Sequence, residues 1–243
     1  MTIILVAFVA FVATLLGGSF AIRFRDRLHL ILGFSAGAVV GVALFDLLPE
    51  AMALGNKYYD PARLALFIAC GFLGYLVLDR LVLIHPHGHD EHDHHHEEPQ
   101  SRGAFGAITL SVHSFLDGAA IGVGFQASAT VGMIVAVAVI AHDFSDGINT
   151  VSFILKGGGT WRRAARWLFV DALAPVLGAA TTLLFRIPDS TVGVVLAVFA
   201  GCFLYLGATD LIPESQHRHP RAATTIMTLL GAATIYAVVR LWG

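Results

Sequence analysis

Charge is scarce in this chain. Only 13% of its 243 residues are Asp, Glu, Lys or Arg, whereas 56% are hydrophobic, and the mean hydropathy is +0.75. A soluble domain typically carries about 25% charged residues. The shortage of charge therefore excludes a soluble globular domain and predicts an integral membrane protein. The net charge of −2 gives no indication of a nucleic-acid partner, and we expect none.

Cysteine and the common catalytic motifs are also rare or missing. The two cysteines, Cys70 and Cys202, each lie inside an apolar stretch, which is typical of small packing residues rather than of a disulfide. The chain has no H-E-x-x-H zinc-protease motif and no Gly-rich Lys-Ser/Thr loop for a nucleotide. We therefore expect neither a nucleotide-driven pump nor an enzyme.

Long apolar runs, in contrast, are abundant. A helix needs about 20 apolar residues to cross the hydrocarbon core of a bilayer. The sequence predicts an all-α membrane protein with a single transmembrane domain over residues 1–243. Eight transmembrane helices are expected, at residues 2–22, 29–53, 62–83, 103–126, 130–155, 164–186, 191–213 and 222–242. The first run has no basic residues before it, and we expect it to be a retained span. The break within "QASATVG" is the least marked, but one helix over 103–155 would be far longer than a bilayer requires.

The basic residues predict the orientation of these helices. Ten Lys and Arg residues fall in the loops on one side and four in the loops on the other. Because cytoplasmic loops are enriched in Lys and Arg, the first side is predicted to be cytoplasmic. Both termini then lie outside, in a multi-pass protein of the cell (inner or plasma) membrane.

Two pairs of similar segments occur in the sequence. "HSFLDG" at 113–118 resembles "HDFSDG" at 142–147, and "AGAVVGVALFDLLPE" at 36–50 aligns with "AGCFLYLGATDLIPE" at 200–214. The second alignment places Asp46 opposite Asp210. In both pairs the two spans run in opposite directions, which indicates inverted repeats: spans 1–3 related to spans 6–8, with spans 4 and 5 central. Such repeats are typical of transporters whose site lies near the membrane midplane.

The first pair carries the chemistry. His113 and Asp117 are four residues apart on one helix face, and His142 and Asp146 repeat that spacing. A carboxylate near the middle of a transmembrane helix is unfavourable by about 2.5–3.5 kcal/mol. Lys and Arg, which could pair with it, are absent from the middle of every predicted span. A proton or a cation must compensate. Imidazole and carboxylate together suit Zn²⁺, Fe²⁺ or Mn²⁺, whereas Cu(I) would favour Cys. Taken singly, each His or Asp could equally be a hydrogen-bonded structural group.

With these motifs, the chain resembles the ZIP family of divalent-metal transporters nearly from end to end. The resemblance implies eight spans, outside termini, a His-rich cytoplasmic loop and a transport site on spans 4 and 5. It also implies two metal positions. Asp46 would lie near the outer mouth of the transport path, and Asp210 would lie in the inner exit route. The first position would use His113, Asp117, His142 and Asp146, and the second would use Ser114, Asp143, Asp171 and the shared Asp146. The sequence departs from the family in having Ser114 for Asn, Asp for the frequent Glu, and Thr209 for His.

The predicted loop at 85–102 is rich in His and acidic residues and has the composition of a flexible, metal-binding tract. Its candidate ligands are His85, His87, His89, His92, His94, His95 and His96. The loop either receives metal from the inner gate or serves as a spacer with incidental metal affinity.

The function expected from these features is transport of divalent transition-metal cations toward the cytoplasm. Zn²⁺ is the first candidate, with Fe²⁺, Mn²⁺ and Cd²⁺ as others, and the metal is substrate rather than catalytic cofactor. The expected partners are metal ions and the lipid bilayer, and a homodimer is one option for the assembly. Two alternatives stay open: an intramembrane metal-dependent hydrolase with Asp143 as general base, and a proton-coupled carrier of an organic solute.

Overall fold

The computed structural model describes residues 2–20, 28–84, 99–216 and 222–242. Within these ranges every regular element is a helix, as the sequence predicts. The elements, in chain order, are α1 (Thr2–Phe20), α2 (Leu28–Val42), η1 (Ala43–Leu47), α3 (Leu48–Gly55), α4 (Pro61–Ile84), α5 (Pro99–Ala127), α6 (Ala129–Lys156), α7 (Trp161–Thr181), η2 (Thr182–Leu184), α8 (Asp189–Tyr205), η3 (Leu206–Leu211), α9 (Ile212–Gln216) and α10 (Ala222–Trp242).

The described residues contain eight helical segments long and apolar enough to cross a membrane, which confirms the predicted number of spans. The least marked break proves to be a single residue between α5 and α6. Ser128 is extended there, and its side chain accepts a hydrogen bond from the Val131 N–H at 3.1 Å, as an N-cap does. The observed helix boundaries differ from the predicted ones by up to four residues, and the largest difference is at the start of the fourth span. Helix α5 begins at Pro99, so residues 99–102, predicted to belong to the His-rich loop, are helical. Proline suits a first helical position because no N–H partner is needed there.

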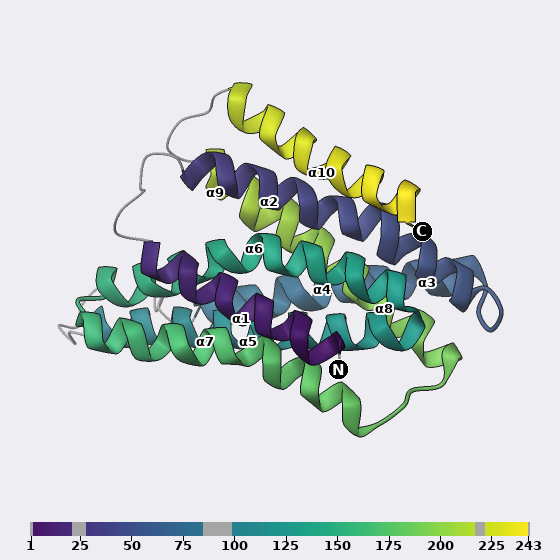
Figure 1. Cartoon of the computed structure of the whole chain (residues 1–243), viewed down its shortest axis with the longest axis horizontal. Coiled ribbons are helices and arrows are strands. Elements are labelled where there is room, and N and C mark those ends of the chain that lie inside the picture. Colours follow the sequence, from purple (N-terminus) through teal and green to yellow (C-terminus); the bar gives the residue numbers. More distant parts are fainter. Residues whose placement is uncertain (1, 21–27, 85–98, 217–221, 243) are drawn as a thin grey trace.

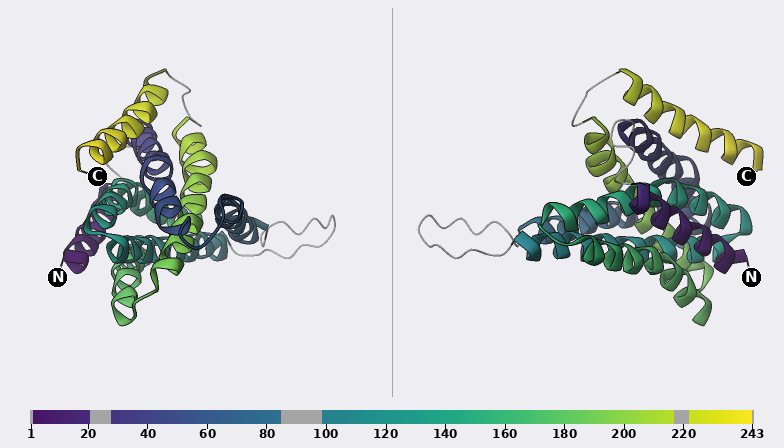
Figure 2. Two further views of the ribbon diagram at one scale, coloured as in Figure 1. Left: turned by 90° about the vertical axis from the view of Figure 1, so that its right-hand side faces the viewer. Right: turned by 60° about the vertical axis from the view of Figure 1, so that its left-hand side comes forward.

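The spans pack as two groups of helices. In the first group, α5 packs along α6 and α7, and α1 packs along α6 and α7 as well. In the second group, α10 packs along α2, and α3 and α4 pack along α8. Figure 2 shows the separation end-on: α10 and α2 lie on one side of the molecule, and α1 and α7 on the other. Helix α2 packs against α6 and thereby joins the groups. The N- and C-terminal ends lie at the same end of the bundle, as an even number of spans requires (Figure 1).

The second sequence repeat has a structural counterpart. Helix α2 passes through the π-helical turn η1 into α3, and α8 passes through the π-helical turn η3 into α9. Each turn ends two residues before a proline, Pro49 or Pro213. Proline cannot donate to the carbonyl four residues earlier, and its ring crowds that carbonyl. A π-helical turn accommodates this conflict, and it places the aligned Asp46 and Asp210 within equivalent turns.

Close contact between α5 and α7 depends on two glycines. A Cβ atom at Gly118 would overlap the Pro175 carbonyl, and one at Gly178 would overlap the Phe115 carbonyl. Small residues of this kind let transmembrane helices approach closely. The approach matters for function, because Ser114 lies one turn before Gly118 and meets a carboxylate of α7.

Candidate metal centre

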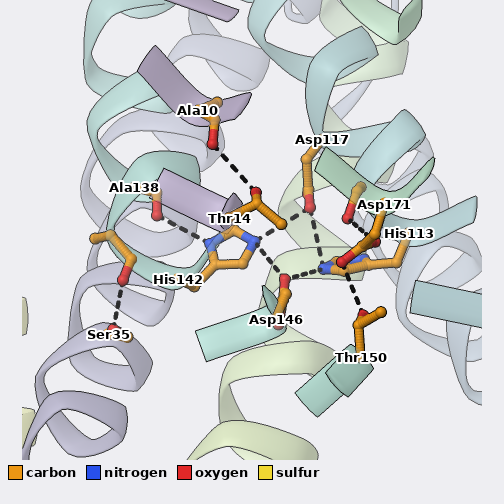
Figure 3. A network of polar contacts seen from close by, with 12 residues as sticks. Ala10, Thr14, Ser35, His113, Asp117, Ala138, His142, Asp146, Thr150 and Asp171 are labelled. Atoms are coloured by element: carbon orange, nitrogen blue, oxygen red, sulfur yellow. Dashed lines mark hydrogen bonds and ion pairs between the residues drawn. The ribbon is translucent and has the colours of Figure 1, made fainter. Parts of the chain in front are cut away.

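Four of the predicted ligands meet at one point. Nitrogen or oxygen atoms of His113, Asp117, His142 and Asp146 all lie within 4.8 Å of one another, and all four residues are buried. Two come from α5 and two from α6, and their side chains converge between the helices (Figure 3). The i, i+4 spacing predicted from sequence thus brings each imidazole beside its carboxylate, and the antiparallel packing of α5 and α6 brings the two pairs together.

The spacing of these atoms suits a small cation. Asp117 Oδ2 lies 3.1 Å from both His113 Nε2 and His142 Nε2, and Asp146 Oδ2 lies 3.8 Å from each of the same nitrogens. In a tetrahedral zinc site with bonds of about 2.0–2.2 Å, neighbouring ligand atoms are about 3.4 Å apart. The observed separations bracket that value, so a modest adjustment would place all four atoms at bonding distance from one ion.

The hydrogen bond of His142 determines which of its nitrogens can bind. Its Nδ1 lies 2.9 Å from the carbonyl oxygen of Ala138, one turn earlier on α6. Because a carbonyl only accepts, Nδ1 carries the proton, and in the neutral ring Nε2 presents a lone pair. A lone pair 3.1 Å from a carboxylate oxygen is repulsive unless a proton or a cation lies between them. The four-residue cluster therefore requires a positive charge at its centre.

His113 is oriented by a residue that the sequence did not single out. Tyr75 Oη on α4 shares a 2.9 Å hydrogen bond with His113 Nδ1, and the two rings meet edge to face at 5.7 Å. A phenol hydroxyl can donate or accept, so it can satisfy Nδ1 in either tautomer. Nothing in the local sequence of α4 marks Tyr75, because its role depends on how α4 packs beside α5.

The sixth-span acid, Asp171, forms a separate buried network. Ser114 Oγ donates to Asp171 Oδ1 at 2.9 Å, and Thr150 Oγ1 donates to Asp171 Oδ2 at 2.8 Å. The structure thus brings together Ser114 and Asp171, as the resemblance implied, but each carboxylate oxygen already has a hydroxyl donor (Figure 3). Thr150 was not predicted. It lies four residues after Asp146, on the turn of α6 that faces α7.

Asp143 differs from its neighbours. It is fully buried, and neither carboxylate oxygen has a hydrogen-bond partner in the described part of the chain. Buried polar groups nearly always have a partner, so this carboxylate is available to a cation. Asp46 is also buried in η1, beside α6 and α8, and its Oδ2 has no partner among the described residues.

Two sets of predicted residues cannot be placed. The side chain of Asp210 lies outside the described residues, although its backbone belongs to η3. The seven histidines of the predicted loop also lie outside them.

Comparison with known proteins identifies the family. A family model described as the ZIP zinc transporter matches residues 85–238, which is more than half of the chain and includes both His/Asp motifs. The chain belongs to the ZIP zinc transporter family. This confirms the resemblance drawn from the motifs of spans 4 and 5.

Individual ZIP relatives are more distant. Zinc transporter zipt-7.1 of Caenorhabditis briggsae is 24% identical over 241 residues, covering 77% of this chain and 62% of the relative. Zinc transporter ZIP13 of Pongo abelii is 24% identical over 227 residues, covering 88% of this chain and 66% of the relative. Human zinc transporter ZIP6 is 30% identical over 138 residues, covering 54% of this chain and 18% of the relative. The chain spans less than two thirds of the length of these relatives. Their names describe transporters and lend no support to a hydrolase.

Proposed function

We propose that this protein carries divalent transition-metal ions, Zn²⁺ first among them, across a membrane through the cluster on α5 and α6. The observation that carries the proposal is the convergence of two imidazoles and two carboxylates inside a bundle of membrane-length helices. Membership of the ZIP family supports the same conclusion. Fe²⁺, Mn²⁺ and Cd²⁺ are further candidate substrates, since they accept the same nitrogen and oxygen ligands.

The chain's own residues suggest how the ion is held. Asp117 and Asp146 supply negative charge, and the two Nε2 atoms supply neutral donors. A divalent ion offsets the unfavourable burial of two carboxylates, so the site attracts the ion without any basic side chain. Asp143, with both oxygens available, and the shared Asp146 would provide most of a second position. Ser114 and Asp171 would join it only by exchanging the hydrogen bond that links them.

Passage requires the site to open to each side in turn. The two helix groups contact each other beside the cluster, and movement of one group against the other would expose the ion alternately. We infer that the ion enters past Asp46 and leaves toward the cytoplasm past Asp210 and the His-rich loop. This direction follows from the predicted orientation, with both termini outside the cell membrane.

Uptake of Zn²⁺ into proteoliposomes tests the proposal. We expect the wild type to accumulate the ion, and His142→Ala and Asp117→Ala to lose at least nine tenths of the rate while still folding in the membrane. Undiminished uptake by both variants would refute the proposal. Turnover of a peptide or lipid by the purified protein, without metal flux, would favour the hydrolase instead.

A further inference from the structure

Hydrogen bonds from Ser35 and Tyr75 connect the helix groups, and both reach the immediate surroundings of the candidate ligands. Ser35 Oγ on α2 donates to the Ala141 carbonyl at 2.6 Å, next to His142 in the chain. Tyr75 Oη on α4 bonds to the imidazole of His113 itself, at 2.9 Å. Helix α4 packs along α8 and meets α5 only locally, and the Tyr75 side chain reaches from α4 to the metal cluster.

The two histidines are therefore held in different ways. His142 is held by a carbonyl of its own helix, and this hydrogen bond persists however the helix groups are arranged. His113 is held by a hydroxyl of the opposite group. A His ring without such a partner can turn over about its Cβ–Cγ bond, which replaces Nδ1 by Cδ2 and Nε2 by Cε1, so that a carbon faces the metal cluster. Partners of this kind fix the ring orientation of metal-binding histidines.

Tyr75 is itself firmly placed. Its ring lies 5.4 Å from that of Tyr205 on α8, which in turn meets the Phe72 ring at 5.3 Å. Tyr205 Oη donates to Asp79 Oδ2 at 2.9 Å, which ties α8 to α4. Tyr75 and His113 also line a cavity of about 20 Å³, shared with Asp117 and Cys202. A cavity of this size holds about one water molecule, so Tyr75 borders both the candidate ligand His113 and the space beside it.

We propose that Tyr75 is a positioning residue that prepares His113 for metal binding only while the two helix groups are arranged as in this structure. This inference rests on the proposed function. When Nε2 binds the ion, Nδ1 carries the proton and donates to Tyr75 Oη. Movement of α4 away from α5 removes that acceptor and weakens the hold of His113 on the ion. The ion consequently favours the present arrangement, and separation of the groups favours release, since a ligand shifts a conformational equilibrium through its differential affinity.

Tyr75→Phe tests the proposal, with Tyr205→Phe as the matched control. Both variants remove one hydroxyl from the same aromatic cluster, but only the first hydroxyl bonds to a candidate ligand. Loss of a partner of a metal ligand typically weakens affinity about 10–100-fold. For a neutral phenol we expect the lower end, about a 10-fold rise in Kd for Zn²⁺ and in the KM of uptake, with Vmax not reduced. Tyr205→Phe should leave both within about 2-fold of the wild type.

A double variant shows whether Tyr75 acts through His113. Once His113→Ala has been introduced, Tyr75→Phe should cause no further loss of Zn²⁺ affinity. An unchanged Kd in Tyr75→Phe, an equal rise in Tyr205→Phe, or an additive loss in the double variant would each overturn the inference while the wild type still transports. A wild type that neither binds nor transports Zn²⁺ would instead refute the proposed function, and the inference with it.

Discussion

Replacing Asp117 by Asn probes the charge at the centre of the cluster. Asp117 Oδ2 lies 3.1 Å from the Nε2 atoms of both histidines. It is closer to them than Asp146 Oδ2, which lies 3.8 Å from each. The amide has nearly the same shape but no charge. Breaking a buried charge pair by removing one partner typically loses about 3–5 kcal/mol. At about 1.36 kcal/mol per tenfold change, Asp117→Asn should weaken Zn²⁺ binding by about two to four powers of ten.

Thermal unfolding of the purified protein with and without Zn²⁺ measures this loss. A ligand at 100 times its Kd stabilises the folded state by about 2.7 kcal/mol. The wild type should show that gain at 100 times its own Kd. A variant that binds 100-fold more weakly would gain only about 0.4 kcal/mol at the same concentration. Without metal, Asp117→Asn should unfold at the same temperature as the wild type or higher, because an unpaired carboxylate at this depth is unfavourable.

Asp79→Asn is the control for this prediction. Asp79 is a partly buried carboxylate on α4 that accepts a hydrogen bond from Tyr205, and it lies outside the four-residue cluster. Its replacement should leave the Zn²⁺-induced stabilisation unchanged. The reasoning would be refuted if Asp117→Asn kept the full stabilisation by Zn²⁺, or if Asp79→Asn abolished it equally.

Two further predictions concern the scaffold of the site. Asp171→Ala deprives the hydroxyls of Ser114 and Thr150 of their acceptor; each buried hydroxyl left unsatisfied should lower the stability by about 1–3 kcal/mol, measured by thermal unfolding, and Asp171→Asn should lose less because it keeps one acceptor. A loss of stability in Asp171→Ala no greater than that in Asp171→Asn would contradict this. Gly118→Leu should force α5 and α7 apart and abolish Zn²⁺ uptake, whereas Gly74→Leu, at a glycine with open space around it, should be tolerated; equal effects in uptake and unfolding assays would refute the close-contact argument.

Local patterns in the sequence were sufficient for much of this architecture. Apolar runs of membrane length predict the eight spans, and the His113–Asp117 and His142–Asp146 spacings predict which side chains share a helix face. Both inferences need only the helical period and the cost of burying charge. The inverted repeat also predicts that the segments around Asp46 and Asp210 are alike, and the structure has equivalent π-helical turns there.

Other features depend on tertiary packing and leave no local signal. Tyr75 resembles any membrane tyrosine until α4 is placed beside α5, and Thr150 resembles any helical threonine until α7 brings Asp171 to it. The hydrogen bond from Ser114 to Asp171 likewise depends on how α5 packs against α7. The resemblance assigned these two residues to a second metal position, and in the structure they are bonded to each other.

Anomalous X-ray scattering at the zinc edge, from crystals of the wild-type protein soaked in Zn²⁺, tests the central claim most directly. The account predicts an anomalous peak enclosed by the Nε2 atoms of His113 and His142 and by carboxylate oxygens of Asp117 and Asp146, each about 2.0–2.2 Å from the ion. The same peak should be absent from Asp117→Asn crystals soaked identically. Zinc bound elsewhere in the bundle, with these four side chains left uncoordinated, would contradict it.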